Sequence, residues 1–122
     1  MDITLFSFGF KHGHPEADMV WDVRFLPNPY WVPELRLHTG LEAEVASYVL
    51  ANEAGERFLA LLEPLLLFVV DEHAARDRES LTLAIGCTGG KHRSVALVEH
   101  LRLLLAAKGY SPEAHHRDID KE

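Results

Sequence analysis

The segment from Leu81 to Lys108 limits the possible folds more than any other part of the sequence. It begins with the apolar stretch LTLAI, which is typical of a strand that is covered on both faces. The loop GCTGGKHRS follows, and its glycines end the strand. From Ser94 to Lys108 the apolar residues recur at helical spacing, and Gly109 marks the helix end. A buried strand, a tight loop and a helix in this order predict an α/β fold with a mainly parallel sheet.

Three further stretches have the composition of strands, which gives a four-stranded sheet. They are rich in β-branched and aromatic residues or end at turn residues, although the last one is the weakest of the set. The four strands are expected at Ile3–Phe8, Met19–Val23, Leu81–Ile85 and Glu113–Ile119.

Two more helices should fill the interval between the second and third strands. Thr39 and Glu42 have the spacing of a capping box, which predicts a helix from about Leu41 towards Asn52. A second helix is expected to begin near Gly55. Pro64 removes a backbone donor within it and should kink or divide this helix.

Length and composition indicate one domain over residues 1–122 that is soluble and cytoplasmic. The hydrophobic fraction of 48% suffices for a single core. The longest apolar run, LLLFVV, is far too short for a bilayer span, and the first residues carry an acid where a secretory signal would carry a base. A single cysteine suits a reducing compartment. The formal net charge of -7 argues against diffuse attraction to nucleic acid or to an anionic membrane.

Cationic side chains nevertheless lie at the end of every predicted strand or directly after it. Because the carboxyl ends of parallel strands meet at one edge of a sheet, these side chains should surround one electropositive pocket. The residues after the first three strands are Lys11 and His12, then Arg24, then Lys91, His92 and Arg93, and those at the end of the fourth strand are His116 and Arg117.

The loop between the third strand and the last helix has the features of an anion site. Gly86, Gly89 and Gly90 let backbone N–H groups approach a ligand closely, and the helix N-terminus that follows favours negative charge. Arg93 could hold a phosphate through two parallel hydrogen bonds. Thr88 and Ser94 add hydroxyl donors to a site that also includes Lys91 and His92.

The same loop permits a catalytic alternative, because Cys87, Arg93 and Ser94 match the Cys-x5-Arg-Ser loop of cysteine-dependent phosphatases. The helix N-terminus and Arg93 would lower the pKa of the attacking thiol, and Asp22 could protonate the leaving group. A small cysteine packed at the end of a buried strand is the commoner reading. We therefore expect a binding module, not an enzyme.

Other candidate residues allow more than one interpretation. Asp22 could bind ligand hydroxyl or amino groups, or it could simply pair with Arg24. Tyr30 and its neighbour Trp31 could stack on a sugar or pack on the sheet. The histidines lack partner ligands at recognisable spacings, so no metal and no cofactor is expected.

Taken together, the segments SFGFKHG, DVRFLPNPYW, TGLEAEV, AIGCTGGKHRSVALVEHL and HHRDI resemble a known family. The chain resembles the C-terminal domain of the RNase adapter protein RapZ, of the nucleotide-binding family also labelled UPF0042, over nearly its whole length. Longer members begin with a P-loop domain, whereas no G-x-x-x-x-G-K-[ST] motif occurs here. The chain is therefore expected to be a separately encoded domain or a piece of a longer protein, without nucleotide hydrolysis.

The resemblance implies a domain that senses a sugar phosphate, glucosamine-6-phosphate in the enterobacterial member, and acts as a regulatory adapter towards a protein partner. The enterobacterial sequence has histidine where this chain has Tyr30, so the identity of the sugar is left open. The binding positions it implies are Asp22, Arg24, Cys87, Thr88, Gly89, Gly90, His92 and Arg93.

The resemblance also implies a homo-oligomer, and in enterobacteria it implies binding of small regulatory RNAs. The enterobacterial tail is basic, whereas this chain ends in DIDKE. This tail and the negative net charge disfavour RNA binding.

Overall fold

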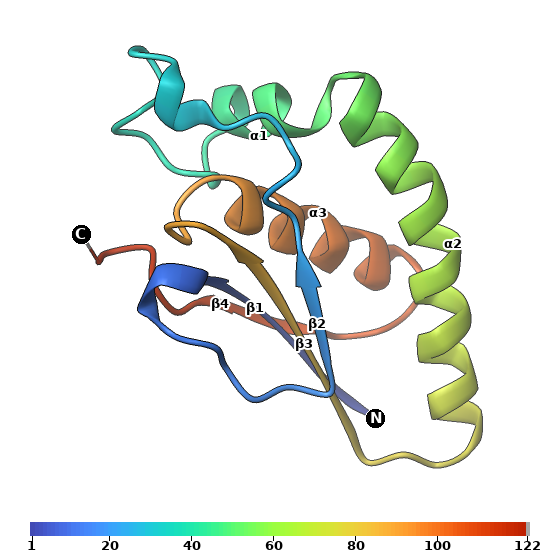
Figure 1. Cartoon of the computed structure of the whole chain (residues 1–122). Helices are drawn as coiled ribbons and strands as arrows, with labels where there is room; N and C mark the ends of the chain where they lie inside the picture. The colour runs from blue at the N-terminus through green and yellow to red at the C-terminus, as the bar shows by residue number, and fades with distance from the viewer. Residues whose placement is uncertain (122) are drawn as a thin grey trace.

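The computed structural model describes residues 1–121 and has the α/β architecture that the sequence predicts (Figure 1). Its four strands form one sheet in which every neighbouring pair is parallel, in the order β2-β3-β1-β4. The strands are β1 (Asp2–Gly9), β2 (Met19–Asp22), β3 (Ser80–Cys87) and β4 (Glu113–His116).

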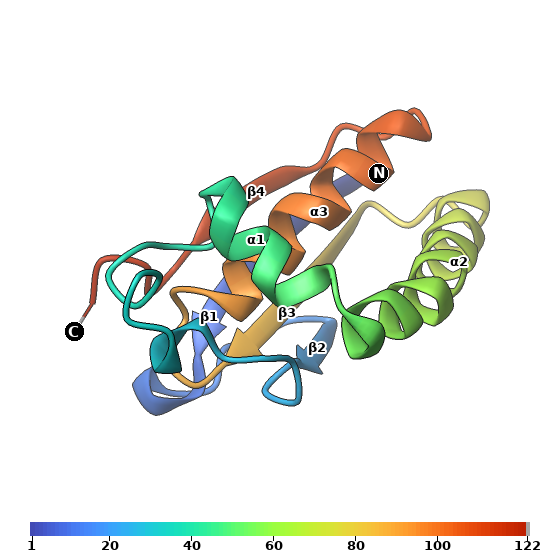
Figure 2. The same ribbon diagram turned by 90° about the horizontal axis from the view of Figure 1, so that it is seen from above.

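The helices lie on one face of the sheet (Figures 1 and 2). They are α1 (Ala43–Leu50), α2 (Glu53–Ala75) and α3 (Arg93–Ala107). Two short 3-10 turns follow the first two strands, η1 (Phe10–His12) and η2 (Pro29–Trp31). No helix within residues 1–121 combines the length and the apolar character needed to cross a membrane.

Alternation along the central strands divides the core into two parts. Leu5, Leu83 and Ile85 point towards the helices and belong to the main cluster, which includes Leu97 and Leu101 of α3. The opposite face carries a smaller cluster of Phe6, Phe8 and Ala84, against which Phe10 and Ala17 of the segment after β1 pack. The two central strands are thus covered on both faces, which confirms the prediction made for β3 from its apolar sequence.

Local signals placed the elements well, with three differences. Glu42 Oε2 accepts from the Thr39 N–H at 2.9 Å, but the Thr39 hydroxyl accepts from Leu41 at 3.3 Å, so only half of the capping box forms and α1 begins at Ala43. Pro64 does not divide α2, which continues unbroken to Ala75 because Leu62, Leu66 and Val70 bury one face of it in the core. The weakest strand prediction extended to Ile119, whereas β4 ends at His116.

Candidate anion site at the carboxyl end of the sheet

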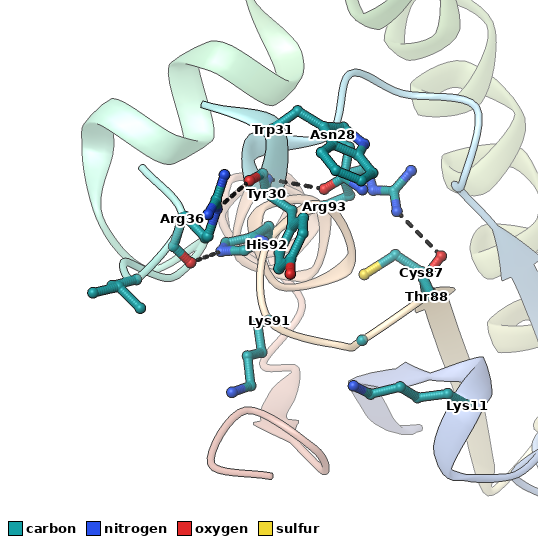
Figure 3. Close-up of a pocket in the computed structure, with 12 residues that line it drawn as sticks. Lys11, Asn28, Tyr30, Trp31, Arg36, Cys87, Thr88, Lys91, His92 and Arg93 are labelled. Carbon is teal, nitrogen blue, oxygen red and sulfur yellow. Dashed lines mark hydrogen bonds between the residues drawn. The ribbon is translucent and has the colours of Figure 1, made fainter. Parts of the chain in front are cut away.

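The loop after β3 lines a cavity of about 660 Å³ (Figure 3). Three segments form the cavity wall: the β3–α3 loop, η1 through Lys11, and the segment after β2 that contains η2. The strand order makes this possible, because β1 and β2 both adjoin β3 and their carboxyl ends flank the loop. The lining residues are Lys11, Asn28, Tyr30, Trp31, Arg36, Leu37, Cys87, Thr88, Gly89, Lys91, His92 and Arg93.

The cavity is positively charged although the chain as a whole is acidic. Its lining includes Lys11, Arg36, Lys91 and Arg93, and no Asp or Glu among the residues that the structure describes. In Figure 3 the Lys11 and Lys91 side chains extend from opposite sides of the loop. A concave site that is lined by cations attracts anions strongly, even on a protein whose net charge is negative.

Arg93 is the most deeply placed of these cations, with 5% of its surface exposed. Its Nη1 donates to the Arg24 carbonyl at 2.6 Å and more weakly to the Leu26 carbonyl at 3.4 Å. Its Nη2 lies 3.4 Å from the Thr88 hydroxyl. Its Nε is buried and has no partner within residues 1–121. A buried guanidinium N–H without an acceptor is costly, so Arg93 Nε is a donor that an anion could satisfy.

Backbone N–H groups of the loop also lack hydrogen-bond partners within the described chain, as Arg93 Nε does. Within residues 1–121, the N–H groups from Gly89 to His92 donate no hydrogen bond to backbone or side chain. No side chain caps the N-terminus of α3. These N–H groups and the positive end of the helix dipole are therefore available to a ligand that carries negative charge.

Two glycines allow the loop to pack this tightly against β1. Gly90 has φ of +77°, in the left-handed region. A Cβ at Gly9 would lie 2.4 Å from the Gly89 carbonyl carbon. The Gly9 N–H is held in turn by the buried Asp118 carboxylate at 2.7 Å.

Cys87 and Ser94 form a buried pair beneath the loop. The Cys87 Sγ lies 3.1 Å from the Ser94 hydroxyl and 3.5 Å from the Ser94 backbone nitrogen. Ser94 is fully buried, while Cys87 reaches the cavity wall. Both Ser94 groups are able to donate to a sulfur that carries negative charge.

His92 has a structural contact on the other side of the cavity. Its Nε2 donates to the Arg36 carbonyl at 3.1 Å. Burial lowers the pKa of His92 and outweighs the backbone hydrogen bonds that favour its charged form. We therefore treat His92 as neutral, and as a tether between the loop and the segment after η2.

The segment after β2 forms an aromatic wall. The Asn28 side chain caps η2 by accepting from the Tyr30 N–H at 3.1 Å. Tyr30 and Trp31 meet edge to face with ring centroids 5.0 Å apart. The Arg36 guanidinium lies 4.9 Å from the centre of the Tyr30 ring and donates to the Tyr30 carbonyl at 2.7 Å.

The comparison with known families agrees with this architecture. A family model described as the RapZ C-terminal domain matches residues 1–120. The chain belongs to this family.

Curated relatives of the RapZ C-terminal domain family include proteins named nucleotide-binding protein. The one from Cutibacterium acnes is 52% identical, with 95% of this chain and 40% of the relative covered. Those from Nocardioides and Lachnoclostridium phytofermentans are 48% and 49% identical over 100% and 98% of this chain, and 41% and 42% of their own lengths. The chain thus spans about two fifths of these relatives.

Eight of the positions singled out in this family member from its sequence line the cavity. They come from three segments that are far apart along the chain, as the convergence of strand ends predicts. They are Lys11, Tyr30, Cys87, Thr88, Gly89, Lys91, His92 and Arg93.

Two positions implied by the resemblance, Asp22 and Arg24, do not line the cavity. The Arg24 Nη2 and the Asp22 Oδ2 form an exposed ion pair at 2.6 Å. Hydrogen bonding from the Arg24 side chain lowers the pKa of Asp22 and keeps it ionised. Arg24 also lies over the Phe10 ring at 4.1 Å. Of the two roles open to Asp22, the geometry shows the ion pair.

The remaining sequence candidates have other contacts. Gly90 packs against Gly9, and Ser94 lies behind Cys87. His116 hydrogen-bonds Ser7 at 2.7 Å and Glu99 at 2.9 Å, so it is not at the rim.

Arg117 pairs with Asp118 at 2.8 Å and donates to the Gly13 carbonyl. His12 does not line the cavity either, although its Nε2 is buried without a partner within residues 1–121. The sheet therefore brings together the ends of β1, β2 and β3, but the residues at the end of β4 make polar contacts with Ser7, Glu99 and Asp118 instead.

Sequence reasoning did not select three lining residues: Asn28, Arg36 and Leu37. Trp31 also lines the cavity; the sequence left open whether it stacks on a sugar or packs on the sheet. Arg36 and Leu37 carried no signal in the sequence, because they lie in an irregular segment whose path is set by tertiary contacts. Within residues 1–121, no three His, Cys, Asp or Glu side chains gather where they could hold a metal ion.

Proposed function

We propose that this domain binds a sugar phosphate, such as the amino-sugar phosphate glucosamine-6-phosphate, without converting it, and signals its occupancy to a protein partner. The observation that carries the proposal is the unpartnered Nε–H of the buried Arg93, next to the unused loop amides. Both kinds of donor need an acceptor with several oxygens, and a phosphate group supplies one.

The phosphate would lie on the amides from Gly89 to His92, with Arg93 Nε as its charged donor. Lys11 and Lys91 would balance the second negative charge from the cavity walls. The absence of any carboxylate from the described lining supports a dianion over a cationic or neutral ligand.

The sugar would extend towards the segment after β2. Tyr30 and Trp31 offer aromatic faces, and the Asn28 amide group is available to donate, since only its carbonyl is used for the cap. Asp22 and Arg24 play no part in this arrangement, because they are paired with one another outside the cavity. A cavity of about 660 Å³ is within the usual range for small-molecule sites.

Titration calorimetry tests this proposal with inorganic phosphate, glucosamine-6-phosphate and unphosphorylated glucosamine. We expect both phosphates to bind and glucosamine to fail. Arg93→Gln removes a charge-assisted hydrogen bond worth roughly 1.5–3 kcal/mol, which corresponds to roughly a 10- to 150-fold loss of affinity. The exposed Arg57→Gln is the matched control and should bind normally.

Arg93 also donates a hydrogen bond to the Arg24 carbonyl, which stabilises the segment after β2. The free energy of unfolding of Arg93→Gln must therefore be measured without ligand. If neither phosphate binds the folded wild-type domain, the proposed function is abandoned.

The Cys87–Ser94 pair favours a second candidate, a cysteine-dependent phosphatase. The thiolate would attack phosphorus and form a phosphocysteine as the P–O bond to the leaving alcohol breaks, and water would then hydrolyse that intermediate. Asp22 is not placed to protonate the alcohol, because it is paired with Arg24 and lies outside the cavity. A phosphate-release assay with Cys87→Ser decides between the two: turnover that the substitution abolishes supports catalysis, and no turnover leaves the binding module.

A further inference from the structure

The cations of this acidic chain that lack a carboxylate partner are concentrated in one place. The sequence has 12 Lys and Arg against 19 Asp and Glu, so carboxylate partners are in excess. Seven of the cations form an ion pair within residues 1–121: Arg24, Arg57, Arg76, Arg78, Arg102, Arg117 and Lys121. The other five have no carboxylate partner among the described residues, and these are Lys11, Arg36, Lys91, Arg93 and Lys108. Four of the five line the cavity at the end of β3, whereas Lys108 lies at the end of α3.

A single phosphate group would leave part of this charge uncompensated. The four cations of the cavity carry one positive charge each, whereas a phosphate monoester carries about two negative charges at neutral pH. Positive charge would therefore remain in excess in a cavity whose described lining includes no carboxylate. Like charges that share a cavity repel one another, so a further anionic group on the ligand would lower the electrostatic free energy of the complex.

Arg36 is the cation that the proposed phosphate does not use. Its Nε donates to the Tyr30 carbonyl at 2.7 Å, and its guanidinium lies 4.9 Å from the centre of the Tyr30 ring. These contacts hold the side chain in place, while its two Nη groups have no hydrogen-bond partner within residues 1–121. A guanidinium that is already fixed can bind a carboxylate or a phosphate through parallel hydrogen bonds with little loss of side-chain entropy.

Arg36 and Arg93 occupy two different positions in the cavity. The structure gives them no hydrogen-bond partner in common. In Figure 3 their guanidinium groups lie on opposite sides of the Tyr30 ring. A ligand that contacts both arginines therefore needs two separate anionic groups, and its sugar would lie against Tyr30 between them.

We propose that the ligand of this domain is a sugar phosphate with a second anionic group, a carboxylate or a further phosphate, and that Arg36 binds this second group. The inference rests on the proposed function and narrows its ligand class. The first phosphate occupies the loop amides and Arg93, and the second group pairs with the Nη groups of Arg36. Arg36 thus determines specificity for doubly anionic sugars over sugars with one phosphate.

Titration calorimetry at constant ionic strength compares three ligands with the same carbon skeleton. Glucose-6-phosphate has one anionic group, 6-phosphogluconate adds a carboxylate, and glucose-1,6-bisphosphate adds a second phosphate. We expect at least one of the two doubly anionic ligands to bind roughly tenfold more tightly than glucose-6-phosphate. The ionic strength must be constant because salt screens the attraction between charges.

Arg36→Gln tests which residue is responsible for this affinity ratio. It removes the guanidinium and should bring the affinity of the doubly anionic ligand close to that of glucose-6-phosphate. Lys108→Gln is the matched control, because it removes an unpaired positive charge outside the cavity, and it should leave the ratio unchanged. Circular dichroism establishes that each variant is folded. The ligand that loses its advantage in Arg36→Gln identifies the second group as a carboxylate or a phosphate.

The outcomes distinguish this inference from the proposed function, provided that inorganic phosphate is titrated in the same series. If inorganic phosphate and all three sugars fail to bind the wild-type domain, both are overturned. If phosphate or glucose-6-phosphate binds and neither added group strengthens binding, only this inference is overturned. An advantage that persists in Arg36→Gln overturns it too, since general attraction of charge would then suffice. An equal loss of affinity for all three sugars has the same consequence, because Arg36 would then only shape the cavity wall.

Discussion

Adjacent glycines in the β3–α3 loop should respond to the same substitution in opposite ways. Gly90 has φ of +77°, and a Cβ there would lie 2.6 Å from the Gly9 nitrogen and 2.8 Å from the Phe8 carbonyl carbon. Both atoms belong to the backbone of the central strand β1 and cannot move aside. A Cβ at Gly89 would meet nothing within 4 Å, and φ is not positive there.

The expected magnitudes follow from these surroundings. Alanine in the left-handed region costs roughly 1–2 kcal/mol, and overpacking against rigid atoms adds roughly 1–3 kcal/mol. Alanine also lowers the conformational entropy of the unfolded chain relative to glycine, which stabilises the folded state by roughly 0.4–1 kcal/mol. Gly90→Ala should therefore lower the free energy of unfolding by about 1.5–4 kcal/mol, whereas Gly89→Ala should leave it unchanged or raise it by up to about 1 kcal/mol.

Urea unfolding monitored by tryptophan fluorescence measures both variants, and phosphate titration follows on the folded proteins. Because Gly89 lines the cavity, its added methyl group should weaken phosphate binding without destabilising the domain. Equal losses of stability at the two positions, or a stable Gly90→Ala variant, would show that the loop does not pack against β1 as described.

Two further predictions concern pH. Burial raises the pKa of Asp118, but hydrogen bonds from Arg117, Gly9 and Lys121 outweigh it and hold that pKa well below its usual range. The resulting stabilisation is present above the unfolded pKa of about 3.9 and is lost as the pH falls below it. In urea unfolding, Asp118→Asn should therefore have a lower free energy of unfolding than wild type at neutral pH, and the difference should shrink near about pH 3. A difference that stays constant with pH would contradict this. Burial also lowers the pKa of His92, so the folded chain binds fewer protons there than the unfolded chain and stability should fall as the pH drops through about 6.5. An NMR titration of the His92 ring should give a midpoint below that value, and a midpoint above it would refute the assigned burial.

The local patterns of the sequence determined the elements that form the candidate anion site. The apolar stretch LTLAI predicted β3 and the helical spacing after Ser94 predicted α3, with ends that differ from the observed ones by at most two residues. The glycines between them predicted the loop, whereas anion binding by that loop stays a prediction. These predictions succeed because strand burial, turn formation and helix periodicity depend on residues close together in the chain.

Only the tertiary structure decided which predicted cations share the cavity. Strand order places β4 at the sheet edge beside β1, and the pairing of Ser7 with His116 turns that histidine towards Ser7 and Glu99 in the core. Arg24 pairs with Asp22, while Arg36, which no pattern marked, reaches the cavity. Each of these outcomes depends on which segments, far apart in the sequence, come into contact. Those contacts are set by strand order and register, which the local pattern of apolar and polar residues does not encode.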